Sequence, residues 1–319
     1  GILAGGAALA GRKAAATAAD TRAELPRRTL GRTNVPITTL SIGTAAIGFS
    51  RKYTVEQIGD IVNAALVEGV TSIDTARHYA KAEEGVALGL GSRRDEVFLA
   101  TKVWADSIET AEKSLATSLK VLKTDRVDLL YYHSLGQRDV DGTMDPGGVF
   151  SWLVKQKQAG KTRFLGISGH NLPERFGPFI ESGEVDAIMV LLNFADRYTY
   201  NFEERVLPMA RKKDIGVVAM KVFGGPRGGW ASYGGGKVPP LVGGKYVDLA
   251  IRYALGLPGV ASVNLGVHDP EQVRANVETV KNYRPLEPEE QDLLATAGRQ
   301  MAAEWGPHFG KVSEEEGAG

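Results

Sequence analysis

Cysteine is absent from this chain of 319 residues. Without a thiol, the sequence offers no disulfide, no thiolate metal site, no iron–sulfur cluster and no cysteine nucleophile. An excess of charge of one sign is also lacking, because 38 Lys and Arg residues balance 38 Asp and Glu residues. This neutral balance gives no electrostatic reason to expect nucleic acid or an anionic membrane as a partner.

Several nucleotide and metal motifs are missing as well. No H-E-x-x-H pair occurs and the five histidines are scattered, so we expect no metal. No Rossmann glycine motif is present, and the Gly-rich residues 234–237 lack the spacing and the Ser or Thr of a P-loop. The apolar run over residues 1–11 is too short to cross a membrane, so we expect no membrane insertion.

The first 25 residues fall outside the predicted fold. A mildly apolar Gly/Ala/Leu run is followed by Arg12 and Lys13, and residues 16–18 (Ala-Thr-Ala) resemble a signal cleavage site. This order is typical of the end of an export signal, and the weak hydrophobicity favours the twin-arginine route, although the arginine pair itself is not in the sequence. We therefore expect an exported, periplasmic protein. A disordered extension on a cytoplasmic protein is the alternative.

Strand and helix patterns alternate between residues 26 and 305. Short, almost wholly apolar strands are predicted at 39–43, 70–74, 97–102, 127–133, 164–168, 187–191, 216–221 and 261–266, with helical patterns between them. Parallel strands that are covered on both faces have this continuous apolar character. Eight such units indicate an α/β fold, a closed (β/α)8 TIM barrel in a single domain over residues 26–305.

Four segments stand outside this repeat. Two extended pieces flank turn residues 30–34 and predict an N-terminal hairpin. A long Gly-rich loop, residues 224–245, follows the seventh strand, where lids and specificity elements usually lie. An extra helix is predicted at 287–304, and residues 306–319 are predicted to be a disordered tail.

Ionisable side chains stand at the carboxyl ends of three neighbouring strands. Asp74 ends the second strand, Lys102 the third and His133 the fourth, and Tyr79 follows Asp74 by five residues. Neighbouring parallel strands lie about 4.8 Å apart, so the four side chains should converge on one pocket. Each residue alone could be a cap, a solvated lysine or a satisfied core histidine, but chance does not easily place all four on one face.

This pattern predicts proton donation by a phenol. A free tyrosine has a pKa of about 10, and a nearby ammonium lowers that pKa. We expect Lys102, held by Asp74, to lower the pKa of Tyr79, and His133 to orient a carbonyl oxygen. Together these groups would polarise a C=O bond so that it can accept hydride.

The motifs around these residues resemble the aldo/keto reductase superfamily over nearly all of residues 27–283. The matching pieces are Ile42-Gly43-Thr44, Asp74-Thr75-Ala76 with Tyr79, Thr101-Lys102-Val103-Trp104, Val127-Asp128-Leu129 with His133, Gly166-Ile167-Ser168, and Gln272 to Asn276. The resemblance implies a nicotinamide-dependent reduction of a ketone, aldehyde or sugar-like carbonyl, with Tyr79 as general acid. His133 favours a C=O bond over a C=C bond as the acceptor.

The resemblance also implies a cofactor site, for NADP(H) by family default and for NAD(H) as the alternative. The residues that would form it are Gly43, Thr44, Asp74, Ser168, Met189, Met220, Lys221, Gly266, His268, Gln272 and Asn276. Met189 and Met220 stand where family members carry a carboxamide-binding Gln and a ring-stacking aromatic residue. Basic residues that could meet a 2′-phosphate are thinned to His268, Arg274 and Arg227, which weakens the expectation of NADP(H).

The substrate pocket would include Trp104, Arg77 and His78. Arg77 either contacts an anionic or polyhydroxyl substrate or is a solvated loop residue. Two other functions stay open: an exported, redox-neutral sugar oxidoreductase with a tightly held cofactor, and a non-enzymatic barrel that senses nucleotide as the regulatory subunit of a channel. Neither the identity of the substrate nor the oligomeric state follows from the sequence.

Overall fold

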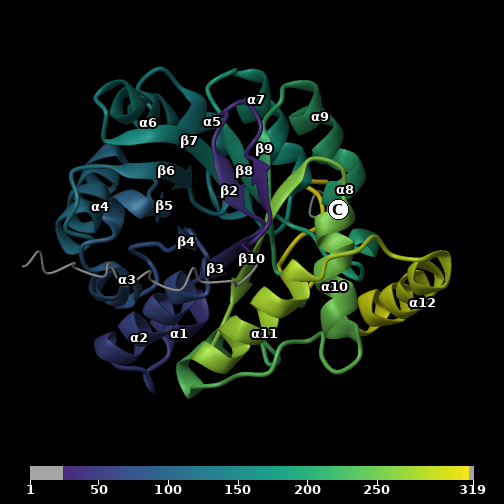
Figure 1. Cartoon of the computed structure of the whole chain (residues 1–319). Helices are drawn as coiled ribbons and strands as arrows, with labels where there is room; N and C mark the ends of the chain where they lie inside the picture. The colour runs from purple at the N-terminus through teal and green to yellow at the C-terminus, as the bar shows by residue number, and fades with distance from the viewer. Residues whose placement is uncertain (1–23, 316–319) are drawn as a thin grey trace, which may run out of the picture.

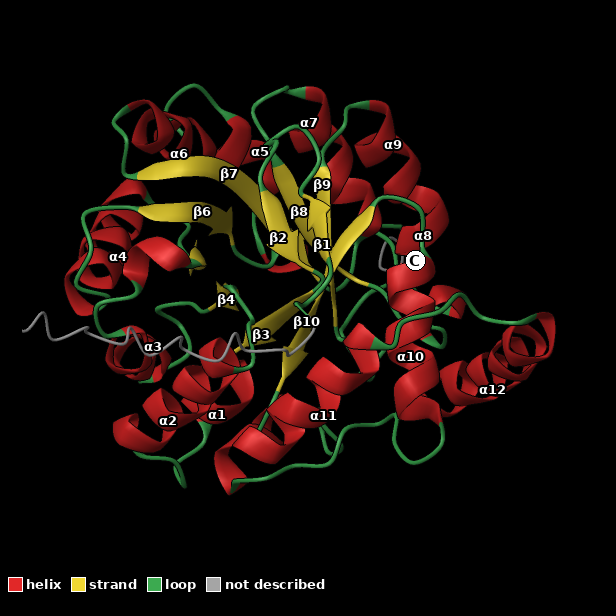
Figure 2. Cartoon of the chain, viewed as in Figure 1, coloured by secondary structure: helices red, strands yellow, loops and turns green. Residues whose placement is uncertain are grey.

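The structure is a computed structural model that describes residues 24–315 of the chain. The predicted export signal therefore lies almost wholly outside the described residues. Eight parallel strands close into a barrel in the order β10-β3-β4-β5-β6-β7-β8-β9 (Figures 1 and 2). They are β3 (Leu40–Gly43), β4 (Ser72–Asp74), β5 (Phe98–Val103), β6 (Val127–Tyr132), β7 (Thr162–Gly169), β8 (Ala187–Leu191), β9 (Gly216–Met220) and β10 (Val260–Gly266). The predicted (β/α)8 barrel is confirmed.

Helices surround this barrel (Figure 2). They are α1 (Ala45–Phe49), α2 (Val55–Val67), α3 (Ala82–Leu90), α4 (Ile108–Val121), α5 (Val140–Met144), α6 (Val149–Gln158), α7 (Phe176–Glu181), α8 (Phe202–Arg205), α9 (Leu207–Lys212), α10 (Tyr246–Gly256), α11 (Pro270–Lys281) and α12 (Pro288–Trp305). The helical pattern predicted between the sixth and seventh strands is split into α8 and α9, because Pro208 has no N–H to donate to the preceding turn. No helix among residues 24–315 has both the length and the apolar character needed to cross a membrane.

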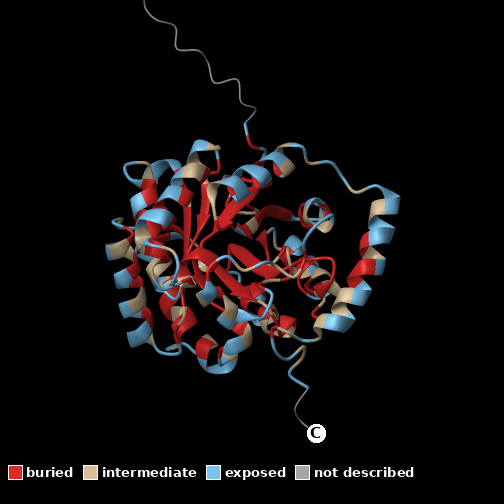
Figure 3. Ribbon diagram, turned by 90° about the horizontal axis from the view of Figure 1, so that it is seen from below, coloured by how far each residue is buried: buried red, intermediate tan, exposed pale blue. Residues whose placement is uncertain are grey.

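Apolar side chains form two layers around the strands. A smaller cluster, which includes Leu129, Tyr131, Met189 and Met220, fills the interior of the barrel. A larger cluster packs between the strands and the helices. Figure 3 shows buried residues along the strands and exposed residues on the outer faces of the helices. Burial on both faces explains why the strand sequences show no polar alternation.

The amino-terminal ends of the strands are covered by the predicted hairpin, formed by β1 (Arg27–Thr29) and β2 (Pro36–Thr38). Leu30 and Ile37 from this hairpin belong to the interior cluster. The Arg28 guanidinium donates to the carbonyl oxygens of Leu255 in α10 and Val260 in β10, at 2.7 and 2.8 Å. The hairpin therefore closes the end of the barrel that lies opposite the predicted site.

Residues 306–315, which follow α12, were predicted to be disordered. In the structure they pack against the barrel. Phe309 is 8% exposed, and its N–H donates to the Tyr200 hydroxyl at 2.7 Å. Asn171 donates to the carbonyl oxygen of Lys311 at 3.3 Å, and Glu314 forms an ion pair with Arg175. The acidic composition predicted disorder, but one buried aromatic ring and these polar contacts attach the segment to the carboxyl ends of the strands.

Candidate active site

Three neighbouring strands bring the predicted ionisable groups together. Asp74 ends β4, Lys102 is the penultimate residue of β5, and His133 follows β6. The Lys102 ammonium donates to both carboxylate oxygens of Asp74 at 2.6 Å and to the carbonyl oxygen of Thr75 at 2.9 Å. Because the Lys102 side chain is only 1% exposed, these contacts are shielded from water. All the donor capacity of the ammonium is used.

Tyr79 reaches the same point from the loop after β4. Its hydroxyl oxygen lies 3.4 Å from Nε2 of His133. Its ring packs against Phe49, with 5.4 Å between the ring centroids. The phenol and the imidazole therefore face one position, where a carbonyl oxygen could accept hydrogen bonds from both.

The pKa of Tyr79 departs from the prediction. Burial raises this pKa well above its ordinary value, and the negative charge of Asp74 raises it further. The Lys102 ammonium lies over the face of the Tyr79 ring, 4.8 Å from its centroid, and its charge is balanced by Asp74. The predicted lowering of the Tyr79 pKa is therefore wrong. The phenol keeps its proton at neutral pH and can act as a donor.

His133 is a neutral imidazole. Burial and the positive charge of Lys102 hold its pKa well below the ordinary value, and its Nδ1 has no hydrogen-bond partner among residues 24–315. Burial also raises the pKa of Asp74 and lowers the pKa of Lys102, while the attraction between these two groups opposes both shifts. The site thus combines one protonated phenol with one imidazole that can donate or accept without carrying charge.

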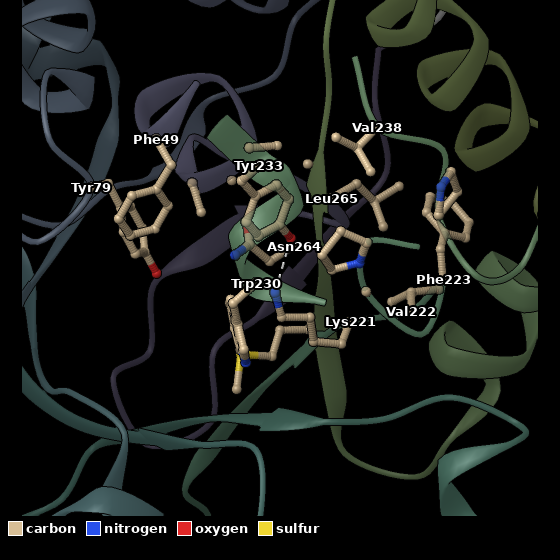
Figure 4. Close-up of a pocket in the computed structure, with 18 of the residues that line it drawn as sticks. Phe49, Tyr79, Lys221, Val222, Phe223, Trp230, Tyr233, Val238, Asn264 and Leu265 are labelled. Carbon is tan, nitrogen blue, oxygen red and sulfur yellow. Dashed lines mark hydrogen bonds between the residues drawn. The ribbon is translucent and has the colours of Figure 1, made fainter. Parts of the chain in front are cut away.

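A cavity of about 990 Å³ opens above these side chains. It extends from Tyr79 and His133 to Gln272 and Asn276 on α11. Figure 4 shows part of its wall, with Lys221 directed toward rings from the loop after β9. Pockets for drug-sized ligands measure about 300–1,000 Å³, so this space admits more than a small carbonyl compound alone.

Most of the predicted cofactor residues line this cavity, namely Gly43, Asp74, Met189, Met220, Lys221, Gly266, His268, Gln272 and Asn276. Thr44 and Ser168 instead lie buried behind its wall. The Thr44 hydroxyl donates to the carbonyl oxygen of Asp74 at 3.0 Å, and the Ser168 hydroxyl accepts from the N–H of Ser134 at 3.2 Å. These two residues support the strand ends and do not form the cavity surface.

Two of the three predicted substrate residues are in place. His78 and Trp104 line the cavity and stack on each other, with ring centroids 4.5 Å apart. Arg77 does not line it, because its guanidinium pairs with Glu83 at 3.1 Å and with Glu84 at 3.0 Å in the first turn of α3. The prediction of Arg77 as a substrate contact is wrong, since these carboxylates take its charge.

Sequence reasoning missed Asn264 on β10. Its amide donates to Asp74 Oδ2 at 3.1 Å, so this carboxylate has a second support beside Lys102. Gly43 leaves room for it, because a Cβ at that position would lie 2.9 Å from Asn264 Oδ1. A lone amide in a largely apolar strand was the available signal. Other lining residues without such a signal are Phe49, Gln137, His170, Trp230 and Tyr233.

The long loop after β9 folds over the cavity, and its residues Trp230–Gly235 form the short turn η5. The carbonyl of Gly234 accepts from the N–H of Arg51 at 3.4 Å, and the N–H of Val238 donates to Nε2 of His268 at 3.4 Å. An ion pair between Lys237 and Asp269 also joins the loop to the residue just before α11. The loop is thus attached to the segments that follow the neighbouring strands β3 and β10.

The residues present fit an elongated polar ligand. Oδ1 of Asn264 and Nδ1 of His268 are buried without a hydrogen-bond partner among the described residues, and both side chains line the cavity. Asn264 lies at the catalytic end beside Asp74, whereas His268 lies just before α11. Buried polar atoms left open in this way call for a ligand or water. A dinucleotide that reaches from Asp74 to α11 would meet both atoms.

Known proteins resemble this chain in sequence and in fold. L-galactose dehydrogenase from Arabidopsis thaliana is 26% identical, with 83% of this chain and 91% of that protein covered. The Bacillus subtilis protein named uncharacterized oxidoreductase YqkF is also 26% identical, with 86% and 97% covered. An aldo-keto reductase from Bacillus halodurans superposes with a TM-score of 0.69 at 24% identity, covering 86% of this chain and 96% of that one.

A further solved structure, an aldo-keto reductase from Klebsiella pneumoniae in complex with NADPH, superposes with a TM-score of 0.66 at 20% identity, covering 86% of this chain and 96% of the other. These likenesses at low identity support the fold. The sequence model of the aldo/keto reductase family matches residues 39–233, more than half of the chain, including Asp74, Tyr79, Lys102 and His133. The protein therefore belongs to the aldo/keto reductase family and is an NAD(P)H-dependent oxidoreductase.

Proposed function

We propose that the protein reduces the carbonyl group of a small ketone, aldehyde or sugar to an alcohol, with Tyr79 as general acid. The observation that carries this proposal is the convergence of the Tyr79 hydroxyl and the His133 imidazole, 3.4 Å apart, at the floor of the cavity. The buried pair of Lys102 and Asp74 directly beneath the phenol supports it further.

In the proposed mechanism the carbonyl oxygen lies between the hydroxyl of Tyr79 and Nε2 of His133. The neutral His133 donates a hydrogen bond from Nε2 and orients the C=O bond. Tyr79 transfers its proton to the oxygen as negative charge develops there. The ammonium of Lys102, over the face of the phenol ring, stabilises the phenolate that remains.

NADP(H) is the cofactor we propose, with NAD(H) as the alternative. When bound, it supplies the hydride that the carbonyl carbon accepts. Gly266, His268, Gln272 and Asn276 would hold its adenosine end, and Met220 would pack against the nicotinamide. The cavity that reaches α11 supports this placement. The NADPH complex of the Klebsiella relative supports the choice of NADP(H).

Replacing Tyr79 with Phe tests the mechanism. Tyr79→Phe keeps the ring contacts with Phe49 and Lys102 but removes the proton, so kcat for aldehyde reduction should fall by about 10²–10⁴-fold, while NADPH affinity stays unchanged. Loss of NADPH absorbance measures the rate, and quenching of tryptophan fluorescence measures the affinity. Tyr198→Phe, at an exposed tyrosine outside the cavity, is the control. Activity near that of the unmodified protein in Tyr79→Phe would contradict the proposal.

The attached loop favours a second candidate, in which the cofactor is not exchanged but is reduced and reoxidised in place. The contacts of Gly234 and Val238 with the segments that follow β3 and β10 support slow release. The net reaction would then be redox-neutral, as one alcohol is oxidised and one carbonyl is reduced. The purified protein should in that case release stoichiometric nucleotide on denaturation. Protein that carries no nucleotide and regains activity only with added NADPH would exclude this candidate.

A further inference from the structure

A buried carboxylate lies four residues after Tyr79 and has no part in the proposed mechanism. Glu83 stands in the first turn of α3, and its side chain is fully buried. Burial raises the pKa of this carboxyl, while the hydrogen bond from Thr101 and the charge of Arg77 oppose the rise. A carboxylate withdrawn from water is costly unless its partners compensate it, so the contacts of Glu83 decide what it does.

One oxygen of Glu83 joins α3 to the strand that carries Lys102. Oε1 accepts a hydrogen bond from the Thr101 hydroxyl at 2.7 Å. Thr101 is fully buried in β5 and directly precedes Lys102. Burial lowers the pKa of Lys102, and the charges of Asp74 and, to a smaller degree, of Glu83 oppose this. Glu83 is therefore fixed to β5 beside the ammonium.

The other oxygen of Glu83 faces Arg77, in the loop that carries Tyr79. Oε2 forms an ion pair with Nη1 of Arg77 at 3.1 Å. Nη2 of the same guanidinium donates to the backbone carbonyl oxygen of Ala80 and, at 3.0 Å, to Glu84. A planar guanidinium holds several acceptors in a fixed geometry, so Arg77 connects the buried carboxylate to the backbone of the residue after Tyr79.

Ala80 has an unfavourable backbone. Its φ is 50°, in the left-handed region that is disfavoured for a residue with a Cβ. Such a conformation persists only where the surrounding contacts impose it, and the hydrogen bond from Arg77 to the carbonyl oxygen of Ala80 is a contact of this kind. Because Ala80 directly follows Tyr79, its conformation sets the direction in which the chain leaves Tyr79, and with it the position of the phenol.

The contacts from Thr101 through Glu83 and Arg77 to Ala80, here called the Glu83–Arg77 bridge, meet again in the active site. Thr101 is next to Lys102, and Ala80 is next to Tyr79. The Lys102 ammonium lies 4.8 Å from the centroid of the Tyr79 ring. The bridge thus joins, from outside the cavity, the two segments whose side chains face each other within it.

We propose that Glu83 and Arg77 are positioning residues for the general acid, and that the Glu83–Arg77 bridge holds Tyr79 where it can pass its proton to the carbonyl oxygen. Neither residue lines the cavity, so neither touches the substrate. Exact placement matters, because a displacement of about 1 Å by a distant substitution can cost about 10²-fold in rate. This inference rests on the proposed function.

Glu83→Gln and Arg77→Met each break the bridge. Glu83→Gln keeps nearly the same shape and can still accept from Thr101, but it has no charge to hold Arg77. Each variant should lower kcat for carbonyl reduction by roughly 10- to 100-fold, with little change in KM for the carbonyl compound or in Kd for NADPH. The full chain is assayed with NADPH and with whichever of butanal, glyceraldehyde and butanone it reduces fastest. Titration with NADPH counts the folded sites, so that kcat is expressed per site.

Ala80→Gly separates positioning from general damage to the fold. Glycine adopts a φ of 50° without strain, so the loop then depends less on the bridge. Added to Glu83→Gln or to Arg77→Met, Ala80→Gly should restore kcat by roughly fivefold or more. If Arg77→Met does not fold, the isosteric Glu83→Gln, with and without Ala80→Gly, decides the question.

Glu84→Gln is the matched comparison. Glu84 also binds Arg77 at 3.0 Å, but its side chain is 38% exposed, and it has no hydrogen bond to β5 among residues 24–315. An exposed ion pair contributes little, so this variant should lose far less activity than Glu83→Gln. Lys245→Met, at an exposed lysine outside the cavity, is the neutral control.

The outcomes separate this inference from the proposed function. Unchanged kcat per NADPH-binding site in both bridge variants would overturn the inference, as would equal losses in Glu83→Gln and Glu84→Gln. A loss that Ala80→Gly restores in neither variant would assign the effect to the fold in general and overturn it too. If KM or Kd rises while kcat stays the same, the residues serve ligand binding and not positioning. Tyr79→Phe with nearly full activity would overturn both proposals, whereas an inactive Tyr79→Phe beside fully active bridge variants would overturn this one alone.

Discussion

Two lysines stand at the carboxyl ends of barrel strands in this protein, and their surroundings differ. Lys102 on β5 is 1% exposed, and its ammonium is bound by Asp74 and by one backbone carbonyl. Lys221 after β9 has aromatic rings and one neutral hydroxyl around its ammonium. The same side chain at equivalent ends of two strands thus has its charge compensated in one place and left open in the other.

This difference gives the two lysines different roles. A carboxylate that lies 2.6 Å from an ammonium balances its charge and occupies its donors, so Lys102 has no donor left for a ligand. Aromatic faces attract a cation without accepting its hydrogen bonds, so Lys221 stays available to a ligand. The partner of a lysine, more than its burial, separates a supporting residue from a binding residue here.

The largest expected effect separates the two lysines by stability. Lys102→Met leaves Asp74 buried without its cation, which should cost about 3–5 kcal/mol of unfolding free energy. Lys221→Met removes only aromatic and hydroxyl contacts and should change that free energy by less than about 1 kcal/mol. Urea unfolding of both variants measures the two values. Similar losses in the two variants would remove the distinction drawn here.

A smaller effect is expected in the pH dependence of stability, through the histidine near each lysine. Burial, together with Lys102 for His133 and Lys221 for His170, holds both pKa values well below the ordinary value. Below about pH 6.5 the unfolded chain therefore binds more protons than the folded chain. Stability should be complete above that pH and fall as the solution becomes more acidic, by about 1.4 kcal/mol for each unit of pKa shift.

His170→Gln isolates the contribution of His170, the histidine near Lys221, to the pH dependence of stability. Its unfolding free energy should depend less on pH between about 6.5 and 5 than that of the unmodified protein. Urea unfolding at several pH values gives both curves, and Lys245→Met again serves as the control. A slope as steep as in the unmodified protein would show that His170 is already charged in the fold.

The smallest expected effect comes from the hydrogen bond that Asn264 donates to Asp74. Asn264→Ala removes the hydrogen bond to Asp74 Oδ2 and should cost about 1–2 kcal/mol, less than Lys102→Met. Urea unfolding gives the free energy, and the pH profile of carbonyl reduction shows whether the catalytic groups are disturbed. A loss as large as that of Lys102→Met would make Asn264 an equal partner of the ion pair.

The barrel and one half of the site were predictable from the sequence. Closing eight strand–helix units brings the carboxyl ends of neighbouring strands together, so Asp74, Lys102 and His133 had to meet. The direction of the Tyr79 pKa was not predictable in the same way. Spacing places Lys102 near the phenol, but only the structure shows that the ammonium faces the ring and is already neutralised by Asp74.

The other half of the site depends on contacts between distant segments. Trp230 and Tyr233 come from a long Gly-rich loop, whose path no periodic pattern defines. Phe309 lies in a stretch whose acidic composition predicted disorder, yet it packs beside Lys221 and His170. From its place near Tyr79, Arg77 was predicted to be either a substrate contact or a solvated loop residue. The carboxylates of α3 that bind it lie on the following helix and could not be weighed from spacing alone.

The position of Phe309 has a consequence for biosynthesis. This residue follows every strand and helix described in the chain, and it completes the wall beside Lys221. Because domains generally begin to fold from the amino terminus during synthesis, the barrel can close before this ring has left the ribosome. A newly made chain would then hold Asp74, Lys102 and Tyr79 in place while the surroundings of Lys221 are still incomplete. The groups proposed for proton transfer would be in place before this wall of the cavity is complete.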